Sequence, residues 1–199
     1  MVGTGRILLI TKDFNIQGPS SYVKDLSFFM AGRGTDVHVV CYGNEECDYD
    51  LGEKIHVHQV RFILGANNTY NWHMLMNNEL KRKSRELMEK NDFDLIHCID
   101  WTAYPTAIGV SRMFDKPYVI TLYSTEKERG LGVYESGMIS DIEWMSTYDA
   151  GYIITLNQDT RNVLIHDYGV PSGKITLATE NGKDPYEETE HVYERMLNN

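Results

Sequence analysis

Short apolar runs rich in β-branched residues alternate along this chain with segments in which apolar residues recur every three or four positions. The runs predict strands and the intervening segments predict helices. The predicted strands cover residues 6–11, 36–42, 54–60, 94–99, 117–122, 151–156 and 174–178. Runs such as Ile7-Leu8-Leu9-Ile10 have no polar alternation, which is typical of strands buried on both faces. The pattern therefore predicts an α/β fold, with a mainly parallel sheet of about seven strands between two layers of helices.

The predicted helices carry start and stop signals at several of their ends. Ser20 or Ser21 caps the first helix, and Gly32 and Gly34 close it. Asn157 caps the fifth helix. The four predicted helices that precede the fifth cover residues 22–30, 72–87, 103–114 and 138–148.

In two of the predicted helices, the spacing of apolar residues predicts which side chains face the core. Three-residue steps within 138–148 assign to the core the residues Ile139, Ile142, Met145 and Tyr148. A last helix begins at Asp184 and Pro185, with Glu187 three positions after the cap. Its apolar face needs a groove on the main domain and consists of Tyr186, Val192, Tyr193, Met196 and Leu197.

The run 54–60 differs from the other strands because polar and apolar residues alternate in it. His56, His58 and Val60 share one face, and Ile55 and Val57 share the other. This alternation predicts an edge strand. Two histidines on one face could hold a metal ion, but no third ligand lies nearby in the sequence. A solvated edge is the favoured interpretation, and no metal site is predicted.

Charge and composition restrict the possible partners. The 199 residues include 19 Lys and Arg against 29 Asp and Glu, which gives a formal net charge of -10. This charge disfavours nucleic acid and anionic lipid, whereas a neutral sugar polymer meets no such barrier. Within and beside the basic run from Lys81 to Arg85, acidic and basic residues lie four positions apart, which favours a salt-bridged helix face. The expected pairs are Glu79 with Lys83, Arg82 with Glu86 and Arg85 with Glu89.

Cysteine usage and hydropathy predict the compartment. The three cysteines are odd in number and form no C-x-x-C pair, which disfavours a disulfide framework and a structural zinc site. No apolar run reaches the roughly 18 residues that a membrane span needs, and the N-terminus lacks a signal-peptide pattern. A cytoplasmic location away from the membrane is the expectation.

Ligands of open parallel sheets bind outside the carboxyl ends of the strands, so the loops there are the candidates for function. The first such loop contains one glycine, Gly18, before a helix start that could bind phosphate or sugar hydroxyls. In the second, Asp100 and Trp101 form a pair suited to hold a hexose, although Asp100 as a helix cap and Trp101 as a core residue is an equal alternative. The third loop, 123–132, is long and polar, which favours a mobile lid or a binding loop.

Several segments of this chain resemble motifs of one enzyme family, in the family's order. Residues 93–101 are similar to "FDVIHAHDW", and residues 121–126 after Lys116-Pro117 are similar to "TIHSTE". Further similarities lie at 33–40 (Arg-Gly-His-Glu-Val), 139–144 ("ISEIEW"), 148–150 ("YEA"), 169–171 ("GVP") and 181–184 ("NGVD"). The family is that of the glycogen synthase-like family 4 glycosyltransferases, which have the GT-B fold.

The resemblance implies that residues 1–184 are a Rossmann-like domain, the acceptor-side half of a GT-B enzyme. In the family a second Rossmann-like domain binds the nucleotide-sugar, and here it would begin just after residue 184. Residues 185–199 instead resemble the family's C-terminal helix, which crosses back onto the first domain. We therefore expect a chain without the donor domain, with no cofactor or metal and with no assigned catalytic residue. The expected acceptor-binding or sugar-binding residues are Gly18, Asp100, Trp101, Ser124, Glu126, Arg129 and Glu143.

Three departures from the family motifs weaken the expected site. The glycine-rich loop is reduced to Gly18, and Ile99 and Tyr123 stand where the family has histidines. Isoleucine cannot hydrogen-bond a hydroxyl, and a phenol replaces an imidazole only in part. His97 is retained, but at a strand end it is interpreted as a hydrogen-bonded core histidine.

The leading hypothesis is a homologue of the glycogen synthase-like N-terminal half that transfers no sugar on its own. Its partner would be a glucan or oligosaccharide acceptor. It would serve as a glucan-binding or regulatory protein, or as one subunit of a split hexosyltransferase whose donor domain is another polypeptide. The alternatives are a nucleotide-binding α/β enzyme of another class and an oligomeric scaffold.

Overall fold

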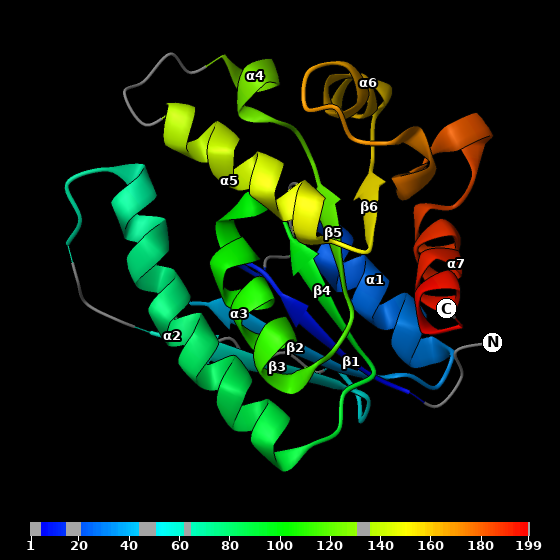
Figure 1. The fold of residues 1–199 in the computed structure, drawn as a ribbon. Coiled ribbons are helices and arrows are strands. Elements are labelled where there is room, and N and C mark those ends of the chain that lie inside the picture. The colour runs from blue at the N-terminus through cyan, green and yellow to red at the C-terminus, as the bar shows by residue number, and fades with distance from the viewer. Residues whose placement is uncertain (1–4, 15–20, 44–50, 62–64, 131–135, 199) are drawn as a thin grey trace.

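A seven-stranded sheet runs through the middle of the molecule (Figure 1). The computed structural model describes residues 5–14, 21–43, 51–61, 65–130 and 136–198. The strands are β1 (Arg6–Ile10), β2 (Asp36–Tyr42), β3 (Ile55–Val60), β4 (Leu95–Ile99), β5 (Tyr118–Leu122), β6 (Tyr152–Thr155) and β7 (Ile175–Leu177). Their order is β3-β2-β1-β4-β5-β6-β7, and every neighbouring pair is parallel. The predicted parallel α/β sheet is confirmed, with β3 at its edge.

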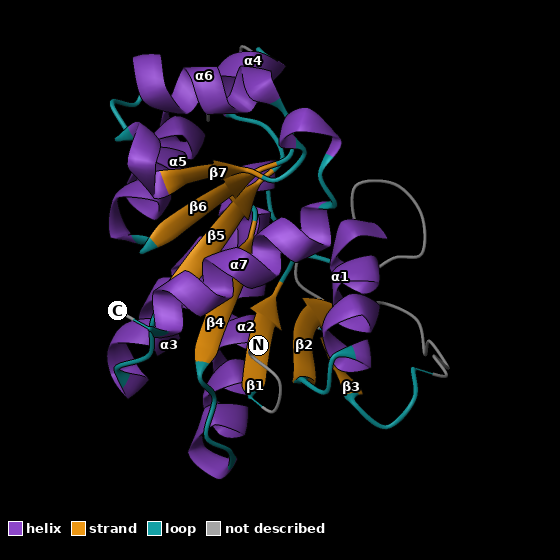
Figure 2. Ribbon diagram, turned by 90° about the vertical axis from the view of Figure 1, so that its right-hand side faces the viewer, coloured by secondary structure: helices purple, strands orange, loops and turns teal. Residues whose placement is uncertain are grey.

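Helices cover both faces of this sheet. They are α1 (Ser21–Gly32), α2 (Thr69–Lys90), α3 (Tyr104–Phe114), α4 (Glu126–Arg129), α5 (Ser136–Asp149), α6 (Gln158–His166) and α7 (Pro185–Leu197). Short 3-10 helices span Trp101–Ala103, Ser172–Lys174 and Glu180–Gly182. Figure 2 shows α1 and α7 together on one face of the sheet, and α2, α3 and α5 contribute to the core on the other face. No described helix is long and apolar enough to cross a membrane.

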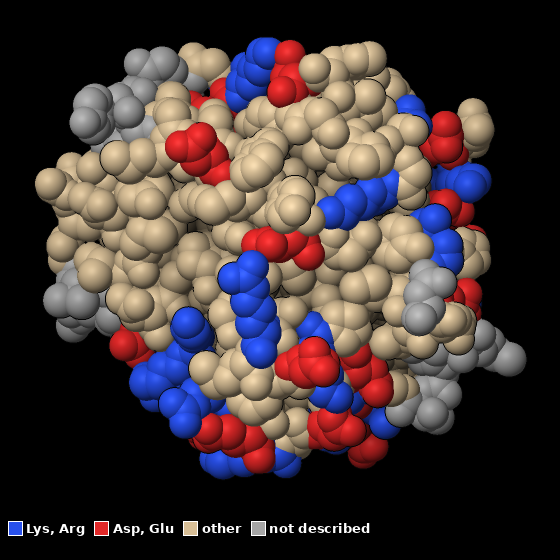
Figure 3. All heavy atoms as spheres, in the orientation of Figure 1, with Lys and Arg blue, Asp and Glu red and all other residues tan. Residues whose placement is uncertain are grey.

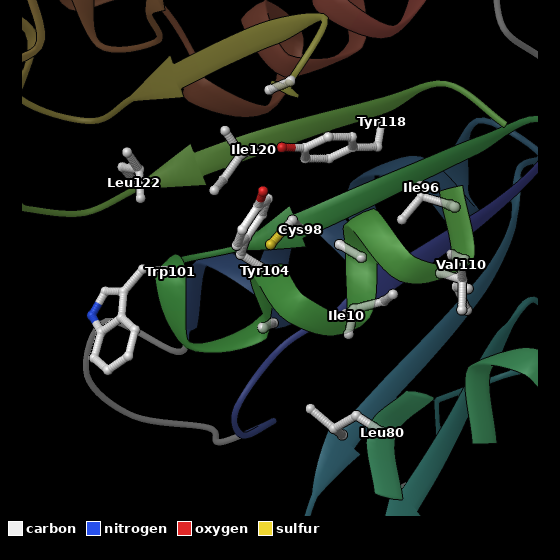
Figure 4. Close-up of a cluster of buried hydrophobic side chains, with 14 of the residues drawn as sticks. Ile10, Leu80, Ile96, Cys98, Trp101, Tyr104, Val110, Tyr118, Ile120 and Leu122 are labelled. Atoms are coloured by element: carbon white, nitrogen blue, oxygen red, sulfur yellow. The ribbon is translucent and has the colours of Figure 1, made fainter. Parts of the chain in front are cut away.

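Alternation along each strand divides the core between the two faces. Leu8 and Ile10 of β1 pack toward α2 and α3, whereas Ile7 and Leu9 pack toward α1 and α7. Figure 4 shows the first of these clusters, in which Cys98, Tyr104 and Ile120 point toward one another between the sheet and α3. Cys41 and Cys98 are both buried and free, as expected for cysteines outside a disulfide framework.

Helix α7 is anchored to the middle of the sheet by one buried tyrosine. Asp184 caps the helix, with Oδ1 accepting from the backbone N–H groups of Tyr186 and Glu187, and Pro185 occupies the first turn as predicted. The hydroxyl of Tyr193 lies 2.5 Å from His97 Nδ1, and His97 Nε2 lies 2.8 Å from Thr121 Oγ1. Burial lowers the pKa of His97 to about 3, so the imidazole is neutral at pH 7. His97 is the hydrogen-bonded core histidine that the sequence predicted.

The face predicted for the helix after the third loop is wrong. Ile139 and Ile142 are buried in α5, but Met145 is 40% exposed and Tyr148 is 72% exposed. Each three-residue step falls about 60° short of a full turn of an α-helix, so three such steps reach the opposite face. The buried positions follow steps of three and four and include Glu143.

The basic run of α2 forms the salt-bridged helix face that its spacing predicted. Arg85 pairs with Glu89 at 2.7 Å as expected, whereas Arg82 pairs with Glu79 and Lys83 with Glu86 at three-residue spacing. Figure 3 shows basic and acidic side chains lying side by side over this part of the surface. The described surface of α2 is therefore not a continuous basic patch.

Candidate functional site

Two of the predicted loops meet at the carboxyl ends of neighbouring strands. Asp100 follows β4 and Glu126 follows β5, and these strands pair directly, with Ile99 opposite Thr121. The backbone N–H of Asp100 donates to the carbonyl oxygen of Thr121 at 2.8 Å, which extends this pairing by one residue. The sequence-predicted residues Asp100 and Glu126 therefore lie close together at the carboxyl-terminal end of the sheet. Gly18 lies outside the described residues.

Trp101 belongs to the core. Its side chain is 5% exposed, and its ring lies 4.9 Å from the ring of His73, centroid to centroid. Figure 4 shows it at the end of the cluster beneath α3. A buried indole offers no open face on which a hexose could stack. The core alternative therefore describes Trp101.

Asp100 combines a capping role with an unusual backbone conformation. Its Oδ1 accepts from the N–H of Trp101 at 2.7 Å, at the start of the 3-10 helix, and its φ of 64° lies in the left-handed region. Such a conformation in a non-glycine residue costs about 1–3 kcal/mol and often marks a functional position. No hydrogen bond to Asp100 Oδ2 is present in the described part of the chain.

The charge of Asp100 is unfavourable in its surroundings. Burial raises its pKa to about 6, Glu143 adds to this, and the Trp101 N–H, Arg129 and Lys12 oppose it. Lys12 follows β1, so the electrostatic coupling joins the carboxyl ends of three adjacent strands. A carboxylate with this pKa changes its protonation state close to physiological pH.

Asp100→Asn should stabilise the protein at pH 7. The folded-state pKa lies above the unfolded value, so ionisation of Asp100 opposes folding above pH 6 and has no such effect below pH 4. Asparagine keeps the cap acceptor and tolerates positive φ. Allowing for partial solvent exposure, we expect a gain of about 1–2 kcal/mol at pH 7 and none at pH 4. Urea unfolding at both pH values measures this, and equal or lower stability at pH 7 would contradict it.

Ser124, Glu126, Arg129 and Glu143 form one buried network. Arg129 pairs with Glu143 through Nη2 and with Glu126 Oε2 through Nε at 3.2 Å. Its Nη1 donates to the carbonyl oxygen and the hydroxyl of Ser124 at 3.1 Å and 3.0 Å. The two Glu143 oxygens accept from the Glu126 N–H at 3.0 Å and 2.8 Å. The structure thus brings together four of the seven predicted residues.

This buried network is satisfied internally. Ser136 Oγ donates to Glu126 Oε1 at 2.6 Å, and the Tyr168 hydroxyl donates to Glu143 Oε2 at 2.7 Å. Burial raises the pKa of Glu143, while the Glu126 N–H, Tyr168 and Arg129 oppose the rise. Because the charged atoms bind one another, their evident effect is to fix the loop after β5 in place.

The described part of the third loop is more ordered than a mobile lid. Residues 126–129 form α4, in which Thr125 and Glu128 make a reciprocal capping box. Glu128 Oε1 also accepts from Thr160 of α6 at 2.8 Å. The Thr-x-x-Glu spacing is a sequence signal from which this short helix could have been predicted. For Ser136 and Tyr168, no local sequence signal indicated a role in the network.

Tyr123 has a buried polar atom that lacks a partner. Its hydroxyl is inaccessible to solvent and has no hydrogen-bond partner in the described part of the chain. Burial raises the pKa of this phenol strongly, and the nearby Tyr22, Asp100 and Asp13 add to the rise. An unsatisfied buried hydroxyl is costly, and in a native structure it often marks a functional position. Among the described residues at the carboxyl ends of the strands, Asp100, Tyr123 and Thr155 each have hydrogen-bonding capacity left over.

Tyr123 packs with the core cluster on the α1 and α7 face of the sheet, whereas a polar groove opens on the opposite face, beside α2 and α3. The groove has a volume of about 740 Å³ and lies between the first turns of α2 and the start of α3. Its lining includes Asn67, Asn71, Asn77, Asn78 and Lys81. The Asn77 amide already bonds His73, Thr102 and Thr106. The other amide side chains both donate and accept hydrogen bonds, which suits a neutral ligand rich in hydroxyl groups.

One protein-family profile matches most of this chain. The profile, described as Glycosyltransferase Family 4, matches residues 16–179. The chain belongs to glycosyltransferase family 4. This assignment confirms the resemblance that the sequence motifs indicated. The family 4 match ends before α7 begins.

Relatives of this family 4 chain are about twice as long. An uncharacterized glycosyltransferase of Methanocaldococcus jannaschii is 26% identical over 187 residues, covering 92% of this chain and 47% of that protein. Sucrose-phosphate synthase from Thermosynechococcus elongatus superimposes with a TM-score of 0.69 at 15% identity, over 87% of this chain and 47% of its own. The chain thus spans about half the length of both proteins.

Two further structural matches show the same fold. A two-segment part of the sucrose-phosphate synthase gives a TM-score of 0.72 at 13% identity, covering 96% of this chain and 98% of that part. Anabaena HepE in complex with UDP and glucose gives a TM-score of 0.58 at 13% identity, over 87% of this chain and 44% of its own. These likenesses confirm the Rossmann-like fold of a GT-B glycosyltransferase.

Proposed function

We propose that this chain forms the acceptor-binding half of a hexosyltransferase, with residues 1–184 as the domain and residues 185–199 as a helix docked on it. The nucleotide-sugar would bind to a second half outside these 199 residues. The relatives' roughly double length supports this division. Family membership favours the proposal over a nucleotide-binding enzyme of another class.

One observation carries the proposal. Asp100 and Tyr123 follow adjacent parallel strands, and each has a polar oxygen without a hydrogen-bond partner in the described residues. A carboxylate oxygen accepts from a sugar hydroxyl, and the Tyr123 phenol can donate to one after a side-chain movement that uncovers its hydroxyl. The amide-lined groove between α2 and the start of α3 offers room for further sugar units. We take a neutral glucan or oligosaccharide as the ligand, since the net charge of -10 opposes a polyanion.

The Arg129 network then has a positioning role. It holds the loop after β5, and with it Ser124, against α5. A fixed loop keeps the neighbouring Tyr123 hydroxyl in place before the ligand arrives, which lowers the entropic cost of binding. Catalysis in a two-domain cleft requires both halves to be aligned with the reacting carbon. We therefore expect no sugar transfer by this chain on its own.

Titration calorimetry with maltohexaose tests the proposed acceptor site. We expect saturable binding that Tyr123→Phe weakens about tenfold, the effect of losing one hydrogen bond in a buried site. Tyr148→Phe is the matched control, since this tyrosine is 72% exposed on α5, and it should bind like wild type. Tyr123→Phe removes an unsatisfied hydroxyl, so it should not reduce stability.

Three outcomes would contradict the proposal. Absence of maltohexaose binding, or equal binding by Tyr123→Phe and wild type, would remove the proposed acceptor site. Release of UDP from UDP-glucose by the purified chain with maltohexaose present would refute the division into two halves.

A further inference from the structure

Asp36, His38 and His56 lie near the amino ends of β2 and β3, the strand ends at the bottom of Figure 2, and His58 follows His56 on the same face of β3. His38 is opposite His56 in the parallel register, and Asp36 lies two residues before His38 on the same face. The acidic and imidazole side chains therefore converge because the sheet aligns them. The sequence argument against a metal missed this, because the additional ligands come from the neighbouring strand.

The distances within this group suit a metal ion. His56 Nε2 lies 3.0 Å from Asp36 Oδ1, and His38 Nε2 lies 3.8 Å from Asp36 Oδ2. One ligand atom from each of the three residues lies within 4.8 Å of the others. Bonds of about 2.0–2.2 Å in a tetrahedron place ligand atoms roughly 3.3 Å apart. Small side-chain rotations would therefore complete a site.

We infer that Asp36, His38 and His56 bind a divalent transition-metal ion, with zinc as the preferred ion. Two imidazole nitrogens and one carboxylate oxygen form a donor set typical of zinc, with the fourth position open to water. Magnesium and calcium prefer sites made of oxygen atoms, which this group does not provide. The His56 side chain is 42% exposed, so the ion can enter from solvent.

The surroundings hold two of the ligands in orientation. His38 Nδ1 lies 2.9 Å from His58 Nε2, and donation from the first nitrogen to the second leaves His38 Nε2 free to bind a metal. Arg6 Nε donates to Asp36 Oδ2 at 2.8 Å, which leaves Oδ1 facing His56. Such outer hydrogen bonds are common around protein-bound metals. The positive charge of Arg6 weakens the affinity of this site for a cation, but its hydrogen bond to Asp36 holds the Asp36 carboxylate in orientation.

The consequence of binding is a cross-link between the edge strand and the rest of the sheet. Asp36 and His38 belong to β2, whereas His56 belongs to β3, which has a neighbour on one side. Metal binding to the folded state alone stabilises it in proportion to the logarithm of metal concentration. The inference is independent of the sugar-binding proposal, because it concerns other residues at the other end of the strands.

Zinc titration of the chelator-treated chain tests this inference. We expect calorimetry to show saturation at one zinc ion per chain, and His56→Gln to weaken binding at least tenfold. His191→Gln is the matched control, because its side chain is 60% exposed and also faces a carboxylate, Glu188 at 3.5 Å. This control should bind zinc like wild type.

Cobalt gives a second measurement that depends on geometry. Co²⁺ bound to the wild-type chain should show the visible ligand-field bands of tetrahedral coordination, and His56→Gln and Asp36→Asn should lose them. Thermal unfolding without metal checks that both variants are folded. Absence of zinc binding at micromolar concentrations, or equal zinc affinity in His56→Gln and wild type, would overturn the inference and leave a hydrogen-bonded histidine cluster.

Discussion

Tyr193→Ala is expected to lower the free energy of unfolding by about 3–5 kcal/mol, the usual cost of removing a fully buried aromatic ring. Tyr193 has no exposed surface, and its ring lies edge-on to the ring of His97 at 5.6 Å between centroids. The substitution also removes the hydroxyl partner of His97 Nδ1 in the core. Leaving that atom unpaired adds to the loss.

Urea unfolding measures this loss, and two further variants separate its causes. Tyr193→Phe keeps the ring and removes only the hydroxyl, so we expect about 1–3 kcal/mol. Tyr148→Ala makes the same truncation at a tyrosine that is 72% exposed, and we expect about 0.5 kcal/mol. If Tyr193→Ala destabilised the protein no more than Tyr148→Ala, α7 would not be an integral part of the domain.

Arg129→Met should have an effect of similar size for an electrostatic reason. The substitution leaves the carboxylates of Glu126 and Glu143 buried without their cation, and Glu143 has no exposed surface. Breaking one side of a buried ion pair typically costs about 3–5 kcal/mol. The loop after β5 would also lose its bonds between Arg129 and Ser124.

The pH dependence of the Arg129→Met deficit identifies its cause. Without the guanidinium, the pKa of Glu143, which burial already raises, rises further, so the variant regains stability when this carboxyl is protonated. We expect the deficit relative to wild type to be largest at pH 7 and clearly smaller at pH 4, by urea unfolding. Arg112→Met is the control, because Arg112 is 70% exposed and its pair with Asp149 should contribute less than about 1 kcal/mol. A deficit equal at both pH values would mean that lost packing, not charge, explains it.

The sheet could be predicted from sequence because most of its strands are apolar runs that are separated by helical segments. The runs at β1 and β6 needed no tertiary information, and the alternation in β3 correctly indicated an edge. Helix faces were harder to predict. In α5 the core-facing positions include Glu143, whose charge is compensated by Arg129, and a hydrophobicity pattern cannot anticipate that compensation.

The candidate site could be predicted in its location but not in its contacts. The rule that ligands collect at carboxyl ends of parallel strands placed Asp100 and Glu126 together. Sequence spacing could not show that Glu126 is already bound by Arg129 and Ser136, nor that Tyr123 keeps an unpaired hydroxyl. The same limit applies to Asp36 and His56, which meet only because β2 and β3 are neighbours.

The central claim is that an acceptor sugar binds at the carboxyl ends of β1, β4 and β5. Amide chemical-shift mapping during titration with maltohexaose tests this claim most directly, because it reports the place of binding as well as its strength. We expect the largest shifts at Lys12, Asp100, Tyr123 and the groove between α2 and α3. Shifts concentrated at the amino ends of the strands, or no shifts at saturating sugar, would contradict it.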